Sequence, residues 1–312
     1  MIIAAPLVIA LAVSLILTPV VRAAMVRAGV LDHPVARSSH HEPKATCGGF
    51  AIFISFWVTT LILQWPPDSV TVGTLVGSLV LLVICFVDDV RGLDPLIRLP
   101  AQIGIAGLTY WWGVRVVGFA NPLAFLLGPQ YVFLGYWSVP VTVLWIVFII
   151  NAVNWLDGID GLAAGVSGIA GLALAGVAAV GGMASIAIPA AALAGSAFGF
   201  LRLNFNPAKV FMGDVGAMFL GYILACLAIM GAVKGPTALV LVVPVLVLGL
   251  PIYDSAATII NRLMAGQPIY QADRKHLHHR LMDQGLSVRE TVLLMYGITG
   301  LLCVIALGVW VR

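Results

Sequence analysis

Ten apolar stretches, separated by short polar segments, most constrain what this chain can fold into. Each is about 17–25 residues long, the length with which an α-helix crosses a bilayer. Charged residues make up only 9% of the chain, whereas they make up about 25% of a soluble domain. We therefore expect an all-α polytopic membrane protein, one integral domain over 1–312, with spans at 2–21, 48–66, 69–87, 96–113, 138–154, 162–181, 184–201, 215–233, 237–256 and 291–311.

Residues 114–137 interrupt this pattern. The segment is broken by glycine and proline and is rich in aromatic residues. It is more typical of a strand pair or an interfacial segment than of a span, although an eleventh span there stays an alternative.

The basic residues are distributed unevenly between the two ends of the expected spans. With ten spans, five polar loops share one side, and they hold thirteen of the sixteen Lys and Arg residues and all six His: 22–47, 87–98, 155–161, 202–214 and 257–290. The positive-inside rule predicts that this side is cytoplasmic and that the N-terminus lies outside. No basic residue precedes the run 2–21, so we expect a span there rather than a cleavable signal peptide.

The cysteines and the glycine-rich run do not indicate a functional site. The four cysteines lie far apart in the sequence, which indicates neither a disulfide framework nor a zinc ribbon. The glycine-rich run 161–176 predicts close packing of helices through small residues.

The most polar helix end is NAVNWLDGIDG, residues 151–161. Asn151, Asn154, Asp157 and Asp160 lie three residues apart, so on a helix they would share one face. So many hard oxygen ligands at the end of a span indicate a cation beside a phosphate.

Two further acidic segments follow apolar or glycine-rich residues. Asp88 and Asp89 end the third stretch, either as an acidic cap or as a carboxylate pair that holds a cation or takes a proton. Adjacent carboxylates raise the pKa of one another, which helps one of them act as a base. Asp214 lies between glycines where a loop enters a span, a position that suits a magnesium ligand or a plain helix cap.

Histidines concentrate in two loops. In DRKHLHHRL, residues 273–281, the histidines His276, His278 and His279 have basic neighbours, which favours an anion site, with zinc as the alternative. The loop 29–49, with Arg37 and His40, fits an ordinary loop as well as a functional one.

Together these segments predict phosphoryl chemistry on a membrane-resident substrate, at one face of the membrane. A secondary transporter is the alternative of another class, but it would carry buried charges near the bilayer midplane. A purely structural scaffold is the third reading.

The chain resembles the polyprenyl-phosphate N-acetylhexosamine-1-phosphate transferases of the glycosyltransferase 4 superfamily, and its motifs follow one another in the family's order. The resemblance covers about 29–286 and is carried by DDVRGLDPLIR, NAVNWLDGIDGLAAG, FNPAKVFMGDVGA and DRKHLHHRL. Ala217 stands where the family usually has serine after the FMGDxG glycine.

The resemblance implies that polyprenyl phosphate attacks the β-phosphorus of a UDP-N-acetylamino sugar, releasing UMP with Mg²⁺, or Mn²⁺ in its place. The implied metal ligands are Asp214 and Asn154, with Asp157 beside them. The implied catalytic carboxylates are Asp88, Asp89 and Asp157. Asp160 is placed near the uridine, and Arg98, His278 and His279 on the phosphates, with further substrate contacts from Asn151, Arg37, His40, Arg202 and Lys209. A direct attack and an aspartyl intermediate both stay open.

The loop ARSSHHEPKATCGG resembles the enzymes that initiate O-antigen, common-antigen or teichoic-acid synthesis more than the phospho-MurNAc-pentapeptide transferases. The implied partners are undecaprenyl phosphate, the bilayer and UDP-GlcNAc, with UDP-QuiNAc, UDP-FucNAc or UDP-MurNAc-pentapeptide as alternative donors. We expect a multi-pass protein of the bacterial inner membrane with a cytoplasmic active site and no nucleic-acid partner. A homodimer is left open.

Overall fold

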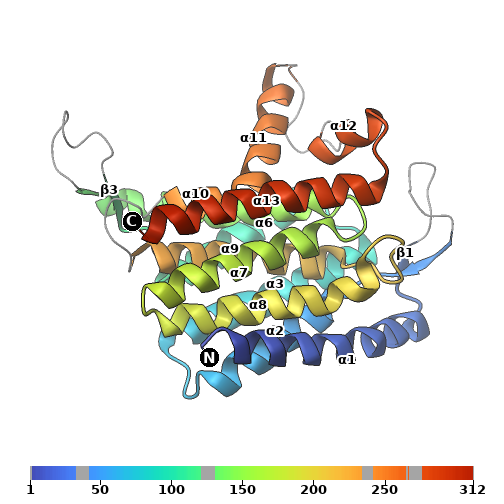
Figure 1. Ribbon diagram of the computed structural model, residues 1–312, viewed down its shortest axis with the longest axis horizontal. Helices are drawn as coiled ribbons and strands as arrows, with labels where there is room; N and C mark the ends of the chain where they lie inside the picture. The colour runs from blue at the N-terminus through green and yellow to red at the C-terminus, as the bar shows by residue number, and fades with distance from the viewer. Residues whose placement is uncertain are drawn as a thin grey trace.

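The computed structural model describes residues 2–32, 42–120, 131–233, 242–264, 266 and 276–311. In this part of the chain, seven helices are long and apolar enough to cross a membrane (Figure 1). The protein is therefore an all-α polytopic membrane protein, which confirms the prediction from hydropathy. The number of spans and their orientation stay predictions.

The helices follow the expected stretches closely. They are α1 (Ala4–Ala28), α2 (Gly49–Leu63), α3 (Ser69–Arg91), α4 (Pro95–Trp111), α6 (Ser138–Leu156), α7 (Leu162–Val180), α8 (Ala184–Asn204), α9 (Gly213–Val233), α10 (Val242–Val247), α11 (Gly249–Met264), α12 (Leu277–Asp283) and α13 (Val288–Val311), with the 3-10 turn η1 (Gly135–Trp137). Two antiparallel strand pairs lie at opposite ends of the bundle: β1 (Leu31–Asp32) with β2 (Lys44–Ala45), and β3 (Gly118–Ala120) with β4 (Tyr131–Phe133) (Figure 1).

Helix α9 forms the centre of the bundle. In its apolar window 83% of the residues are buried, compared with 22% in α1 and 28% in α13. The outer helices therefore keep apolar faces for lipid, while α7, α8 and α9 bury most of their surface inside the bundle.

Small residues allow this close packing, as predicted for the glycine-rich run. A side chain on Gly165 would collide with the ring of Tyr296, and one on Gly168 with the ring of Phe198. Because α13 and α8 approach α7 at these positions, larger residues would force the helices apart.

Two segments depart from a plain sequence of spans. The stretch 237–256 was expected as a single span, but among the described residues it divides at Leu248 into α10 and α11, and α11 projects from the bundle (Figure 1). Within 114–137, Gly118–Ala120 and Tyr131–Phe133 form the pair β3–β4, which confirms the predicted strand pair for these residues. Residues 121–130 lie outside the described ranges.

Candidate active site

Three polar turns meet at the end of the bundle where β1 and α12 lie: the α3–α4 turn, the α6–α7 turn and the α8–α9 loop (Figure 1). Hydrogen bonds join these turns. Arg98 bonds to Asp214, 116 positions away in the sequence, and Asn154 bonds to Asp214, 60 positions away. The prediction that these loops share one end of the bundle is therefore correct.

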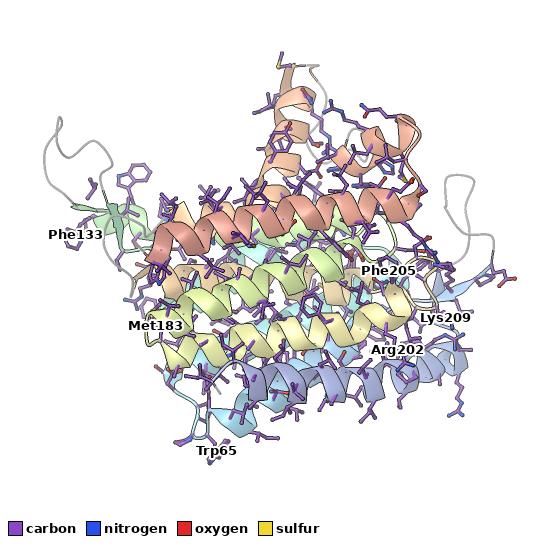
Figure 2. All side chains as sticks on the ribbon, viewed as in Figure 1. Trp65, Phe133, Met183, Arg202, Phe205 and Lys209 are labelled. Carbon is purple, nitrogen blue, oxygen red and sulfur yellow. The ribbon has the colours of Figure 1, made fainter. Side chains whose placement is uncertain are left out.

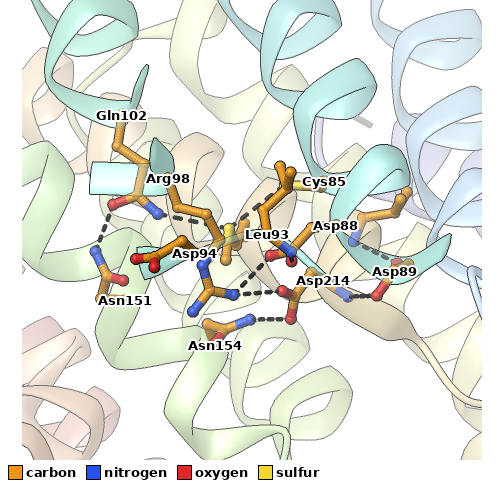
Figure 3. A network of polar contacts seen from close by, with 12 residues as sticks. Cys85, Asp88, Asp89, Leu93, Asp94, Arg98, Gln102, Asn151, Asn154 and Asp214 are labelled. Carbon is orange, nitrogen blue, oxygen red and sulfur yellow. Dashed lines mark hydrogen bonds and ion pairs between the residues drawn. The ribbon is translucent and has the colours of Figure 1, made fainter. Parts of the chain in front are cut away.

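A shared guanidinium joins two carboxylates at the centre of this end (Figure 3). The Nη1 of Arg98 donates to Asp88 Oδ2 at 2.6 Å and to Asp214 Oδ2 at 2.9 Å. Asn154 Nδ2 donates to the other Asp214 oxygen at 2.7 Å. The Asp88 side chain is only 7% exposed, but Arg98 and Asp214 are 29% and 26% exposed, so a ligand can reach the cluster from outside.

The turn between α3 and α4 explains why Arg98 reaches Asp88. Gly92 ends α3 with φ +68, a left-handed conformation that glycine adopts without strain, and Asp94 caps α4 by accepting from Leu96 N–H. The tight turn lets Leu93 N–H donate to Asp88 Oδ1 at 2.6 Å. The first turn of α4 then carries Arg98 back over the end of α3.

Asp89 points away from this cluster and caps a helix other than its own. Its oxygens accept hydrogen bonds from the backbone N–H groups of Asp214 at 2.9 Å and Val215 at 3.2 Å. The Cys47 thiol lies 3.4 Å from Asp89 Oδ2. A carboxylate at a helix N-terminus satisfies free N–H groups and interacts favourably with the helix dipole. Asp89 thus fixes where α9 begins. The alternative that Asp214 is itself the helix cap was wrong, because its side chain bonds to Arg98 and Asn154 instead. The catalytic role of Asp89 stays a prediction.

Gly213 makes the capping contact possible. Its φ is +70, and a Cβ there would lie 2.5 Å from Asp89 Oδ2. Any larger residue would therefore be strained and would push Asp89 off the N-terminus of α9.

The four residues spaced three apart in 151–160 do not share one face. Helix α6 ends at Leu156, so only the two asparagines are helical. Asn151 Nδ2 donates to Gln102 Oε1 at 2.6 Å, beside rather than within the carboxylate cluster (Figure 3). Gln102 was not singled out from the sequence; the available signal was an amide one helical turn after Arg98 in an apolar stretch.

Asp157 follows α6 directly. Desolvation by the surrounding protein, together with the charges of Asp214, Asp89 and Asp160, raises the pKa of the Asp157 carboxyl well above its usual value. No hydrogen bond to this carboxyl comes from the described residues, whereas a cation beside it would stabilise the charged form.

Asp160 turns toward the α8–α9 loop. One oxygen accepts from Asn206 Nδ2 at 3.0 Å and from Ala208 N–H at 2.9 Å. Asn204, which the sequence reading did not single out as a site residue, accepts from Gly161 N–H at 3.1 Å and donates to Val210 O at 3.0 Å. These contacts tie the loop to the α6–α7 turn, and the expected place of Asp160 near a uridine stays a prediction.

Tyr296 of α13 supports the same turn from the other side, and its hydroxyl donates to Gly161 O at 2.5 Å. Replacing Tyr296 by phenylalanine should lower the free energy of unfolding by about 1 kcal/mol. The cost stays modest because Gly161 O also accepts from Gly165 N–H. Thermal unfolding in detergent checks this, with Tyr253→Phe, an exposed tyrosine on α11, as the matched control. Equal melting temperatures for both variants would contradict the role of Tyr296.

The predicted basic contacts are dispersed. Arg202 and Lys209 are exposed at the α8 end on the side of α1 (Figure 2), and Arg22 Nε donates to the backbone oxygen of Lys209. Neither side chain makes a hydrogen bond or ion pair with the described residues. Arg37 and His40 lie outside the described ranges.

The described part of the histidine segment, residues 276–281, packs against the α6–α7 turn. His278 is 1% exposed, and a Cβ on Gly158 would be 2.6 Å from its Nε2. Burial lowers the pKa of His278 to about 3, so the ring is neutral near pH 7. The His279 ring centroid is 4.3 Å from that of His278 and is less buried. In this arrangement His278 does not offer a positive charge to a phosphate, and the phosphate contacts of both residues stay predictions.

The donor set fits a magnesium ion better than zinc. Within the described ranges, no three His, Cys, Asp or Glu side chains gather closely enough to hold a metal by themselves. Mg²⁺ is usually held by one or two carboxylates, with water and substrate phosphates completing the octahedron. Such oxygens come from the carboxylates of Asp214 and Asp88 and from the nearby side chains of Asn154 and Asp157.

The fold and the site define a polytopic membrane protein whose polar end combines carboxylate and amide oxygens with the guanidinium of Arg98. Phosphoryl transfer needs groups of both kinds. Residues 71–232 match the family described as glycosyl transferase family 4. The chain is 37% identical over 289 residues, 93% of its length and 80% of the relative's, to the probable undecaprenyl-phosphate N-acetylglucosaminyl 1-phosphate transferase of Bacillus subtilis (strain 168). The chain belongs to glycosyl transferase family 4 and is a phosphotransferase.

Other relatives agree with this membership. The decaprenyl-phosphate N-acetylglucosaminephosphotransferase of Mycobacterium tuberculosis (strain ATCC 25618 / H37Rv) is 32% identical over 86% of the chain and 73% of its own length. The undecaprenyl-phosphate alpha-N-acetylglucosaminyl 1-phosphate transferase of Haemophilus influenzae (strain ATCC 51907 / DSM 11121 / KW20 / Rd) is 29% identical over 86% and 76%. The resemblance read from the motifs is confirmed, and these matches do not favour the transporter alternative.

Proposed function

We propose that this protein transfers N-acetylglucosamine 1-phosphate from UDP-GlcNAc to undecaprenyl phosphate and releases UMP. The observation that carries the proposal is the Arg98 bridge between Asp88 and Asp214 at the polar end of the bundle. The names of relatives from three organisms support the sugar, and two of those names support undecaprenyl phosphate as the lipid. Such a reaction is the first membrane step of cell-surface polysaccharide synthesis.

Both reactants are anions, so their mutual repulsion must be offset before attack. Arg98 supplies a positive charge, and Asp88, which is paired with it, would orient or deprotonate the lipid phosphate. Asp214, with Asn154 and Asp157 near it, would hold Mg²⁺. When bound, the ion neutralises phosphate charge and polarises the reacting phosphorus.

The cluster faces the cytoplasm in this proposal, within the bacterial inner membrane. The distribution of basic residues supports this orientation, because thirteen of sixteen lie in the loops on this side. A cytoplasmic site has direct access to the soluble UDP-sugar, while the acceptor reaches it from the bilayer.

The proposal predicts that purified protein with Mg²⁺, undecaprenyl phosphate and UDP-GlcNAc releases UMP. EDTA should stop the release, and added Mg²⁺ or Mn²⁺ should restore it, because carboxylate and amide oxygens bind both ions. Parallel reactions with UDP-QuiNAc, UDP-FucNAc and UDP-MurNAc-pentapeptide test the choice of donor. Faster UMP release from one of these than from UDP-GlcNAc would contradict the assigned sugar but not the reaction.

A further inference from the structure

Helix α11 buries a polar stripe although it projects from the bundle (Figure 1). Asp254, Thr258 and Arg262, four residues apart, are 2%, 1% and 3% exposed. The opposite face exposes Tyr253, Ile260, Leu263 and Met264. Because a buried carboxylate is costly unless it is paired and hydrogen-bonded, the partners of Asp254 should matter.

Both oxygens of Asp254 are used by the histidine segment. Oδ2 lies 2.8 Å from His276 Nδ1, and Oδ1 accepts the backbone N–H of Leu277 at 2.6 Å. Leu277 begins α12, and the His276 side chain at the cap position makes no capping hydrogen bond. Asp254 of α11 therefore caps α12 and orients the His276 ring at the same time.

The orientation of α12 decides where two rings meet the α6–α7 turn. The His276 and His278 rings are stacked, with centroids 5.8 Å apart and an interplanar angle of 7°. The His276 centroid lies 5.9 Å from that of Trp155, and His278 lies against Gly158. These contacts bracket Asp157, so a shift of α12 would shift the turn that carries the proposed metal-site residues.

We propose that Asp254 is a positioning residue for the transfer reaction: it anchors α12 against the Trp155–Gly158 turn and so holds that turn in its productive geometry. The proposal rests on the proposed function. Among the described residues, the oxygens of Asp254 bond to His276 and Leu277, so Asp254 acts on the proposed site through α12 and makes no hydrogen bond to a site residue itself.

The test compares Asp254→Ala, Asp254→Asn and Ser255→Ala in full-length protein. Asp254→Ala should lower kcat for UMP release on the order of 10- to 100-fold, because small misplacements of reacting groups cost that much. Asp254→Asn should restore most of the activity, since its oxygen still accepts from Leu277 N–H and its amide can donate to His276 Nδ1. Ser255 is the matched control: it is buried beside Asp254, and its hydroxyl has no hydrogen-bond partner among the described residues.

Hydrogen exchange of the amides in 277–283 gives a readout that does not depend on activity. Exchange should become faster in Asp254→Ala and stay protected in Asp254→Asn and Ser255→Ala. If Asp254→Ala kept the kcat of Ser255→Ala per folded molecule, or kept α12 protected, the proposal would be overturned. Failure of the unaltered protein to release UMP would instead refute the proposed function, while the exchange data would still test the anchor.

Discussion

Replacing Asp214 by asparagine is expected to lower kcat for UMP release by about 1,000-fold, the cost of losing a preorganised charge at a reacting centre. Asp214 is the carboxylate on which both Asn154 and Arg98 converge. An asparagine there would turn an N–H group toward one of these donors and would bind a cation far more weakly. The fold should persist, because the contact of Asp89 with α9 uses the backbone N–H of residue 214.

Asp68→Asn is the matched control for this change. Asp68 caps the other end of α3 through Thr71 N–H, and asparagine caps helices equally well. UMP release and melting temperature should both stay unchanged in this variant. Binding of Mn²⁺, followed by electron paramagnetic resonance, should weaken in Asp214→Asn and not in Asp68→Asn. Full UMP release by folded Asp214→Asn would show that the metal assignment is wrong.

Arg98→Ala should lower kcat by roughly 100-fold, because it removes a charged group that the transition state needs. The loss leaves Asp88 and Asp214 without their shared counter-charge and removes a cation for the phosphates. Arg98→Lys should keep kcat within about tenfold of the unaltered protein, although lysine is a poor substitute for an arginine that binds through both arms of its guanidinium. Here a single nitrogen, Nη1, makes both contacts, and an ammonium with three donors can make them too.

The control for Arg98 is Arg91→Ala. Arg91 is exposed in the last turn of α3, and its side chain makes no hydrogen bond or ion pair with the described residues. Steady-state UMP release should be unchanged in this variant. A lysine variant as inactive as the alanine variant would show that the guanidinium plane itself is required.

Hydropathy and loop charge predicted the helices and the gathering of the polar loops, because span length and alternating sides leave few arrangements. They could not predict which of two neighbouring carboxylates faces the cluster. Adjacent residues on a helix point about 100° apart, so the packing of α9 against α3 decides that Asp88 meets Arg98 and Asp89 caps α9.

The three-residue spacing of 151–160 misled for a local reason. A shared face requires the helix to continue, but α6 ends at Leu156, and Asp160 turns to the α8–α9 loop. The supporting residues escaped notice because their partners are remote in the chain. Tyr296 lies 135 positions from Gly161, and Gln102 lies 49 positions from Asn151. A lone polar residue in an apolar stretch does not indicate its partner.

The destination of the β-phosphorus tests the central claim most directly. The protein is incubated with UDP-GlcNAc labelled at the β-phosphorus, undecaprenyl phosphate and Mg²⁺, and the lipid and aqueous phases are then separated. Transfer of the sugar 1-phosphate predicts that the label moves to the lipid product in an amount equal to the UMP released. Label that stays in aqueous UDP while the sugar reaches the lipid, or intact donor that accumulates inside sealed vesicles, would contradict the account.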